Sequence, residues 1–316
     1  MKFIQHIIYR ISQFYATVKT SGHLVAATKA ALFILHKITP VACSGDFAKF
    51  KNTKPSDVKH YLSIVAIIKN EASYIAEWIE YHLLVGVEKF YIYDNESDDN
   101  LRDILEQYII NGIVKYKYYQ GKSKQIIAYN DVLEIAKKET YWLAIIDCDE
   151  FIVPISTYTI PEFLKDFEKY VGVEINWVEY GSSGKKFKED GLVIDRFKRH
   201  SMLESQVNRH VKTICNPRAV ARIDCVHTAI YFEGKYSVNA NKEENNKFFL
   251  DRNAVFDKIR INHYFTKSYE EYLLKRNRGR ADLVELRNIE DFFYFDKNDI
   301  YDPVMDKYIA VLIDKF

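Results

Sequence analysis

The chain of 316 residues is long enough for one large domain or two small ones with a substantial buried core. Hydrophobic residues make up 48% of it and charged residues 28%, which excludes a disordered chain. Because 45 basic residues nearly balance 44 acidic ones, we expect no nucleic acid among its partners.

The four cysteines are Cys43, Cys148, Cys215 and Cys225, and none of them forms a CxxC pair. This spacing argues against a disulfide framework or a zinc site and favours a reducing compartment. We therefore expect a cytoplasmic protein.

The first 45 residues contain no Asp or Glu but five basic residues. Within them, residues 24–38 are apolar but interrupted by Lys29 and Lys37. They predict an amphipathic helix rather than a membrane span, which needs about 18 uninterrupted apolar residues. Two interpretations stay open: the helix lies on the anionic inner face of the membrane, or it packs on the domain.

From residue 62 onward, strand and helix patterns alternate. Residues 62–68 are a β-branched apolar run that predicts a strand, and Ile75, Ile79 and Leu83 predict a helix that ends before Gly86. The same patterns predict further strands at 88–93, 113–119 and 141–146, and helices at 98–112 and 123–139. Such alternation predicts parallel strands joined by helices, and hence an α/β sheet.

The pattern is less regular in the second half. Three further strands are expected. The first lies in 171–184 and runs into a glycine-bounded loop at 181–184, and the others lie at 191–197 and 231–238. Residues 258–268 predict a strand followed by a helix, because Ser268 and Glu271 have the spacing of a capping box. With no internal repeat and no low-complexity linker, this half is expected to pack on the first.

Polar residues follow three of the strands in the first half, at the point where each strand ends. They are Asn70 and Glu71, Asp94 and Asn95, and Asp147 and Asp149. Ligands of open α/β sheets bind beyond the carboxyl ends of the strands, so we expect these residues on one rim. The Asp-x-Asp spacing puts both carboxylates on the same side of an extended segment. Mg²⁺ and Mn²⁺ prefer oxygen ligands of this kind, so the pair predicts a divalent metal site.

Several ordered motifs, "IIKNEASYIAEWIEYHLLVGVEKFYIYDNESDD", "DCDEFI", "NWVEYGSSG" and "NHYFTKSYEEYLLKRNRGRAD", resemble glycosyltransferase family 92, which is related to family 2. The resemblance spans roughly residues 62 to 285. It implies a GT-A fold, a mostly parallel α/β sheet flanked by helices, and a nucleotide-sugar donor, UDP-linked. We accordingly expect a basic helical extension at 1–55, the transferase domain at 56–290 and a C-terminal tail or helix at 291–316.

The resemblance also implies a set of metal ligands. Asp147 and Asp149 would hold Mn²⁺ or Mg²⁺ and the donor diphosphate. His263 would be a further ligand, with His227 as the reserve candidate. A lone histidine between apolar neighbours can equally be a core residue, and that alternative stays open.

The donor would be held by residues from several segments. Asn70, Glu71, Asp94 and Asn95 would line the nucleotide pocket, although Asn70 can instead cap a helix and Asp94 can be a turn residue. A basic run would contact the diphosphate: Lys267, Lys275, Arg276, Arg278 and Arg280. Cations also favour the last turn of a helix, and that alternative is preferred for Arg276 and Arg280. Ser182 and Ser183 would touch the donor or the acceptor sugar; the alternative is an ordinary turn.

Transfer with inversion, which the resemblance suggests, needs a general base for the incoming hydroxyl, and a carboxylate is the usual choice. The candidates are Asp195 and Glu150, placed ahead of Glu179. Glu150 can instead orient the metal ligands.

The expected function is therefore transfer of a sugar to a glycan or lipid-linked acceptor in surface polysaccharide synthesis, with peripheral contact to an anionic membrane. A nucleotidyltransferase is the second enzymatic interpretation. It needs a glycine-rich loop after the first strand, and "KNEASY" contains no glycine. A catalytically inactive sugar- or membrane-binding module of the same fold is the third.

Overall fold

The computed structural model describes residues 45–316 with the exception of 246–249, 252 and 282–285. The amphipathic helix expected at 24–38 therefore lies outside the described residues. No helix within the described ranges is long and apolar enough to cross a membrane. The chain enters the described part through α3 (Gly45–Asn52), whose buried Phe47 ring lies 6.3 Å from the Phe232 ring, centroid to centroid.

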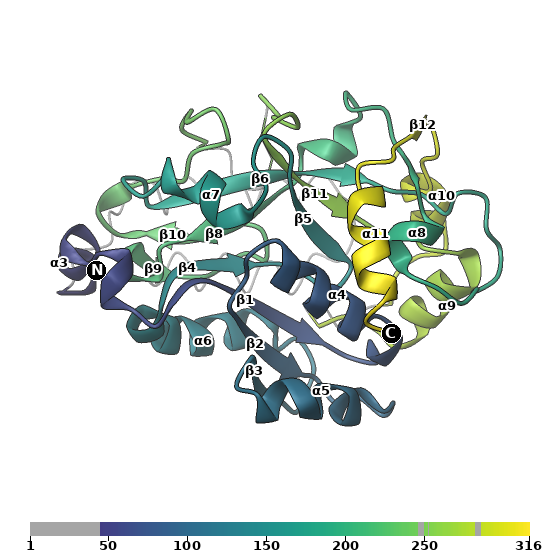
Figure 1. Cartoon of the computed structure of the whole chain (residues 1–316), viewed down its shortest axis with the longest axis horizontal. Coiled ribbons are helices and arrows are strands. Elements are labelled where there is room, and N and C mark those ends of the chain that lie inside the picture. The colour runs from purple at the N-terminus through teal and green to yellow at the C-terminus, as the bar shows by residue number, and fades with distance from the viewer. Residues whose placement is uncertain (1–44, 246–249, 252, 282–285) are drawn as a thin grey trace, which may run out of the picture.

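The first half has the alternation that the sequence predicts (Figure 1). Its elements are β1 (His60–Ile68), α4 (Ala72–Leu84), β2 (Lys89–Asp94), α5 (Leu101–Ile110), β3 (Val114–Tyr118), α6 (Gln125–Glu139) and β4 (Thr140–Ile145). Gly86 and Gly112 follow α4 and α5 with φ of +96° and +73°, a backbone region that favours glycine after a helix end. The predicted strands and helices of this half are confirmed.

All the long strands belong to one eight-stranded sheet of order β3-β2-β1-β4-β8-β6-β11-β5. The added strands are β5 (Glu150–Pro154), β6 (Gly172–Glu179), β8 (Val211–Cys215) and β11 (Ile259–His263). The pairings from β3 to β4 are parallel, β8 is antiparallel to both of its neighbours, β6 is parallel to β11, and β5 is antiparallel to β11. The predicted α/β sheet, with the second half packed on the first, is confirmed.

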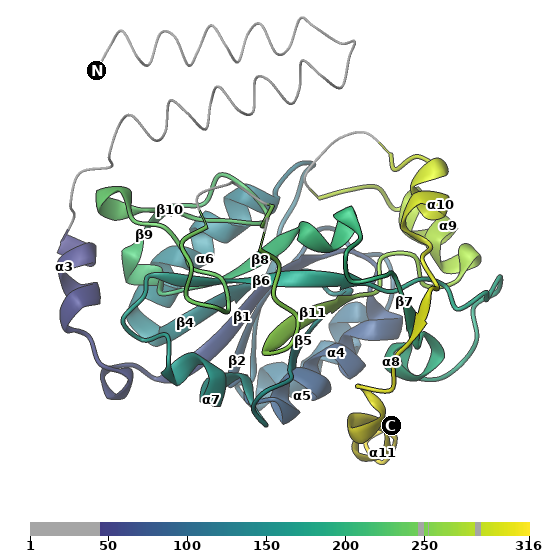
Figure 2. The same cartoon turned by 90° about the horizontal axis from the view of Figure 1, so that it is seen from above.

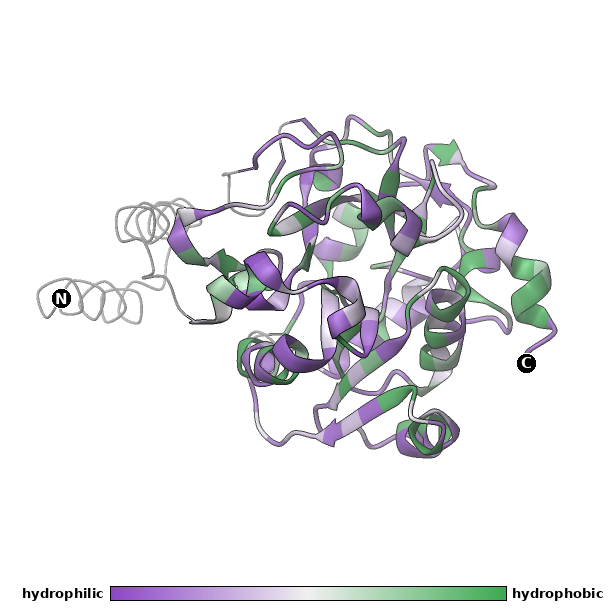
Figure 3. Ribbon diagram, turned by 60° about the vertical axis from the view of Figure 1, so that its left-hand side comes forward, coloured by the Kyte–Doolittle hydropathy of each residue, from purple (hydrophilic) through white to green (hydrophobic). Residues whose placement is uncertain are grey.

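Apolar residues fill both faces of this sheet. Because successive side chains of a strand point to opposite faces, Ile64 of β1 packs on one core and Val65 on the other. The first core includes α4, α5 and α7 (Ile160–Lys165), and the second includes α6, which Figure 2 shows on the opposite side of the sheet. Figure 3 shows hydrophobic residues interspersed with hydrophilic ones along the strands and helices.

The second half departs from the prediction at two places. Residues 191–197 form the short helix α8 (Val193–Arg196) instead of a strand, because the carboxylate of Glu77 accepts the backbone N–H groups at its start. Residues 231–238 hold only the end of β10 (Ile230–Tyr231), because a 3₁₀ turn with positive φ at Glu233 and Gly234 bends the chain. The strand in 171–184 is confirmed as β6, as is the capping box at Ser268 and Glu271, which begins α9 (Tyr269–Asn277).

The remaining elements connect the periphery to this core. The small strands are β7 (Arg199–His200), β9 (Val220–Arg222) and β12 (Ile300–Tyr301), and the last helices are α10 (Glu290–Phe295) and α11 (Asp306–Ile313). The 3₁₀ turns are η1 (Pro55–Asp57), η2 (Gln206–Arg209), η3 (Pro217–Ala219) and η4 (Phe232–Gly234). In Figure 1, α11 lies against α4 and α8, where the Tyr308 ring meets the Tyr81 ring at 5.0 Å.

Candidate active site

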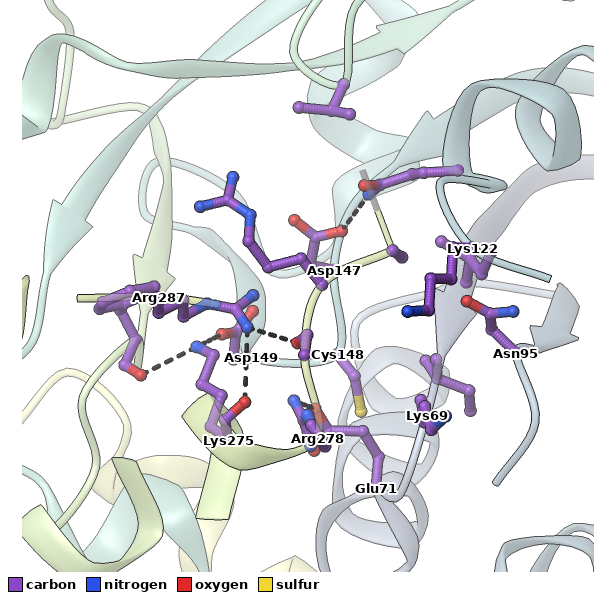
Figure 4. Close-up of a pocket in the computed structure, with 18 of the residues that line it drawn as sticks. Lys69, Glu71, Asn95, Lys122, Asp147, Cys148, Asp149, Lys275, Arg278 and Arg287 are labelled. Atoms are coloured by element: carbon purple, nitrogen blue, oxygen red, sulfur yellow. Dashed lines mark hydrogen bonds and ion pairs between the residues drawn. The ribbon is translucent and has the colours of Figure 1, made fainter. Parts of the chain in front are cut away.

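A pocket of about 450 Å³ lies where β1, β2 and β4 end. Its lining includes Glu71 after β1, Asn95 after β2, and Asp147 and Asp149 from the turn between β4 and β5 (Figure 4). The opposite wall comes from β11, α9 and the residues after α9. Residues from all three polar clusters therefore face one pocket, and its size suits a small-molecule ligand.

Asp147 is the more exposed aspartate of this acidic turn, with 34% of its side chain accessible. Its Oδ2 forms an ion pair of 2.7 Å with Lys212 Nζ from β8, and its Oδ1 accepts a hydrogen bond of 3.0 Å from Gln125 Nε2. Lys212 is 1% exposed, so the protein buries a full cation beneath the turn. The negative charge of Asp147 is thus balanced from inside the fold.

Asp149 is buried and has a different cation. Its Oδ2 forms an ion pair with Lys275 Nζ of α9, which also donates a hydrogen bond of 2.8 Å to the carbonyl of Phe265. Burial alone would raise the pKa of Asp149, but the charges of Lys275 and His263 hold this pKa well below its usual value. Asp149 is therefore an anion at neutral pH.

His263 completes this side of the pocket. Its Nδ1 lies 2.7 Å from Oε2 of the fully buried Glu179, and its Nε2 lies 3.8 Å from Asp149 Oδ2. Burial opposes the charged form, but Glu179 and Asp149 raise the pKa of His263 above its usual value. A carboxylate behind an imidazole fixes the ring orientation, so Nε2 is held towards the acidic turn.

These residues offer donors that suit a divalent cation. Oxygen and imidazole groups are common ligands of such ions, so Asp149 and His263, whose Oδ2 and Nε2 atoms lie 3.8 Å apart, would hold one. Within the described residues, no group of three or more His, Cys, Asp or Glu side chains converges as a complete metal site. Lys275 also shares Oδ2 of Asp149. The set thus fits an ion that takes most of its ligands from phosphate and water, as Mg²⁺ commonly does.

Glu71 and Asn70 lie on neighbouring walls. Glu71 forms an ion pair with Arg278, and its Oε2 is buried without a hydrogen-bond partner among the described residues. Asn70 does not cap α4, because the N-cap position is Glu71 and Asn70 Oδ1 accepts the backbone N–H of Asp98 at 3.0 Å. Asn70 lines a second pocket next to the first.

Asp94 and Asn95 differ although they are neighbours in the chain. Asp94 is buried and accepts hydrogen bonds from Tyr116 Oη at 2.7 Å and from the Ser97 backbone at 2.9 Å. It does not line the pocket. Asp94 is instead a turn residue, which is the alternative that the sequence left open. Asn95 does line the pocket, and its Nδ2 donates to the carbonyls of Tyr119 and Gly121.

Like Asn70 and Asp94, four further expected site residues lie away from this pocket. The backbone N–H groups of Ser182 and Ser183 donate to Asp296 and Asn298 at 2.6 Å, so the glycine-bounded loop packs on the C-terminal region. Asp195 is exposed on α8 and forms an ion pair of 2.8 Å with Lys198. Lys267 lines the second pocket.

The two buried glutamates behind the acidic turn do not line the pocket either. Glu150 is fully buried; its Oε2 accepts the backbone N–H of Asp147 at 3.1 Å, and Lys212 lies 3.4 Å from its Oε1. Burial raises the pKa of Glu150 to about 8. Glu179 is equally buried behind His263. His227, the reserve ligand candidate, lines the pocket, and its ring lies 5.3 Å from that of Trp177.

Three residues of the site were not expected. Lys212 and Gln125 hold Asp147, and the Trp177 ring packs 4.1 Å from the His263 ring. Lys212 left one signal in the sequence, a single lysine within the otherwise apolar or neutral strand "VKTIC". A charged residue in a fully buried strand indicates an oppositely charged partner.

Along most of the domain, the sequence of this chain is similar to sequences of known proteins. The model of glycosyltransferase family 92 matches residues 62–288. A family 92 protein of Arabidopsis thaliana is 35% identical over 102 residues, which are 32% of this chain and 18% of that protein. A family 92 protein of Oryza sativa subsp. japonica is 28% identical over 188 residues, 57% of this chain and 31% of the relative. The chain thus spans less than a third of the length of either relative.

Among solved structures, S. aureus TarS 1–349 in complex with UDP is 15% identical, with a TM-score of 0.34. The match covers 50% of this chain and 47% of that chain, and a likeness this low carries no information on a ligand. The family model, by contrast, covers the sheet, the acidic turn and both walls of the pocket. The chain therefore belongs to glycosyltransferase family 92.

Proposed function

We propose that this protein transfers a sugar, with inversion, from a UDP-linked donor to a glycan or lipid-linked acceptor in surface polysaccharide synthesis. Family membership supports sugar transfer. The observation that carries the donor assignment is the composition of the pocket, in which Asp147 and Asp149 lie among six basic side chains. These are Lys69, Lys122, Lys275, Arg278, Arg280 and Arg287.

This mixture of charges suits a nucleoside diphosphate. Lysine and arginine groups pair with phosphate oxygens, and Arg278 is already oriented by its ion pair with Glu71. Amide and carboxylate groups at the ends of β1 and β2, such as Asn95, can accept hydrogen bonds from ribose hydroxyls or the base. We therefore place the nucleoside against β1 and β2, and the diphosphate between the acidic turn and α9.

Mn²⁺ or Mg²⁺, when bound, would neutralise the negative charge that builds on the leaving diphosphate. Asp149 and His263 would hold it, with Asp147 on the more exposed side of the turn. Glu179 orients His263, and Lys275 balances the charge of Asp149. These contacts keep the acidic turn ordered and anionic before any ligand arrives.

Glu150 is better suited to position the acidic turn than to accept a proton from the acceptor. It is fully buried and binds the Asp147 backbone N–H. It also lies 3.4 Å from Lys212, which itself pairs with Asp147. We propose that Glu150 acts through Asp147 as a positioning residue.

Donor hydrolysis tests the function. Many transferases slowly cleave their donor, so the protein with Mn²⁺ should release UDP from at least one member of a panel of UDP-sugars. Asp149→Asn should lower that rate by about 100-fold or more, by analogy with the loss of one electrostatic contact in other enzymes. Asp190→Asn is the matched control, because Asp190 is exposed in a loop outside the pocket.

Two results would contradict the proposal. Release of UDP from none of the sugars, with UDP still binding, would indicate an inactive sugar-binding module. Equal release by the protein and by Asp149→Asn would show that the acidic turn does not hold the donor.

A further inference from the structure

A second pocket, of about 500 Å³, adjoins the first. The two share a wall formed by Lys69, Phe265, Lys275, Asn277 and Arg278. Figure 4 shows Lys275, Arg278 and Lys69 in a row along one side of the first pocket. Beyond them the second pocket extends to the start of α4 and to Lys267. A molecule in the second pocket would therefore lie beside the donor proposed for the first.

Lys267 is an unusual lining residue. It is only 4% exposed, and its backbone has φ of +49°, in the left-handed region that a lysine rarely adopts. Its Nζ lies 4.3 Å from the centroid of the Tyr74 ring and forms no hydrogen bond or ion pair with any described residue. Lys267 interacts electrostatically with the carboxylates of Asp149 and Glu77 but forms an ion pair with neither. A buried cation without a hydrogen bond or an ion pair and a strained backbone are both unfavourable, and such features persist mainly at ligand sites.

The acidic residues of the second pocket do not neutralise Lys267. Glu271 is committed elsewhere: it accepts two hydrogen bonds from Arg196, at 3.1 and 2.9 Å, and others from Ser268 and Tyr74. Asp98, the other acidic residue of this lining, is exposed at the rim.

The other cations of the lining add to the positive charge. Lys275 and Arg278 have carboxylate partners in the shared wall. Lys69 forms no ion pair with any described carboxylate, and Lys188 donates from Nζ to Ser73 Oγ at 2.9 Å. The cavity is thus built for a negatively charged group.

We propose that the second pocket binds an acidic group, a carboxylate or a phosphate, carried by the acceptor sugar, and that Lys267 is its ion-pair partner. This inference rests on the proposed transferase function. The rings of Tyr74 and Phe265 supply apolar surface of the kind on which sugar rings pack. The shared wall at Lys275 brings the acceptor next to the acidic turn, where the donor sugar is released.

The test compares three sugars as probes, with UDP and Mn²⁺ present throughout. Glucuronate carries a carboxylate, glucose 6-phosphate carries a phosphate, and glucose carries neither. In titrations followed by ligand-observed NMR, at least one acidic sugar should bind the unmodified protein about tenfold or more tightly than glucose, because a charge-assisted contact is gained. The sugar that binds identifies the acidic group.

Variants then assign the contact. Lys267→Met should abolish the preference for the acidic sugar while UDP affinity stays within twofold, which also shows that the variant is folded. Lys267→Arg should restore part of the preference. Lys165→Met, which changes an exposed lysine of α7 outside both pockets, should keep all of it.

Two results would overturn the inference: equal binding of all three sugars, or a loss of UDP affinity in Lys267→Met as large as the loss of sugar affinity. The last would assign Lys267 to the donor. Failure of UDP to bind the unmodified protein would instead contradict the proposed function, so the two failures are distinguishable.

Discussion

The acidic turn between β4 and β5 and the junction of α4 with α8 both bury carboxylates, but in different ways. In the turn, Asp149 pairs with Lys275, and its pKa is held well below the usual value. At the junction, Glu77 accepts backbone N–H groups from Val193 at 2.8 Å and Ile194 at 3.0 Å. No Lys or Arg of the described chain forms an ion pair with it. Burial therefore raises the pKa of Glu77 to about 7.

This difference separates a carboxylate that is available to a ligand from one that holds the backbone. An anion paired with a lysine stays charged in the dry interior and can exchange that partner for another cation. A carboxylate bonded to the N–H groups at the start of a helix fixes the chain there. The acidic turn is therefore suited to binding, and Glu77 is suited to folding.

The largest effect on stability should follow from Lys275→Met. Removing one partner of a buried ion pair leaves an uncompensated charge on Asp149, so the free energy of unfolding should fall by about 3–5 kcal/mol. Urea denaturation measures the loss, with Lys165→Met as the control. Adding Asp149→Asn should restore part of it, and a double mutant no more stable than the single one would contradict the pairing.

The junction should respond less strongly. Glu77→Ala leaves the N–H groups of Val193 and Ile194 buried without partners, at about 1–2 kcal/mol each. We expect a total loss of about 2–4 kcal/mol, together with faster hydrogen exchange at these two amides. Unchanged exchange at both would show that Glu77 does not hold α8.

The junction should also give stability a dependence on pH. The pKa of Glu77 is about 7 in the folded protein, above its usual 4.5, so the folded state binds more protons between these values. The free energy of unfolding should therefore fall as pH rises towards and through 7, by up to about 1.4 kcal/mol per pH unit. Glu77→Gln, which cannot titrate, should show a shallower fall between pH 5 and 8. An identical slope would contradict the assignment.

The smallest effect is expected at the surface of α8. Asp195 pairs with Lys198, which also contacts Asp306 of α11 at 2.9 Å. Asp195→Asn should lower the free energy of unfolding by less than about 1 kcal/mol, as is usual for exposed pairs. If Asp195→Asn lowered the free energy of unfolding as much as Glu77→Ala, burial would not explain the difference between Glu77 and Asp195.

The sequence alone predicted the parallel strands of the first half and the polar residues at the rim. The patterns that indicate them lie within short segments of the chain. Apolar runs, helical periodicity and glycine stops predicted each element from β1 to β4. The polar residues where the strands end then marked Glu71, Asn95, Asp147 and Asp149, which do line one pocket.

The sequence did not predict contacts between segments that lie far apart in the chain. Lys212 is 65 residues from Asp147 in sequence, and Lys275 is 126 residues from Asp149, so the charge balance of the turn depends on the tertiary fold. The apolar run at Val193 and Ile194 resembles a strand until Glu77, more than 100 residues away, captures its N–H groups. The same long-range packing places Asp195 outside the pocket.

We propose that Asp149 lies where a UDP-linked donor and its metal bind. The most direct measurement is the thermal midpoint of unfolding with UDP and Mn²⁺ together, each alone, and neither. At 100 times the dissociation constant, bound ligand should add about 2.7 kcal/mol, which raises the midpoint by several degrees. Asp149→Asn should lose this shift and Asp190→Asn should retain it. No shift in the unmodified protein, or an equal shift in Asp149→Asn, would contradict the claim.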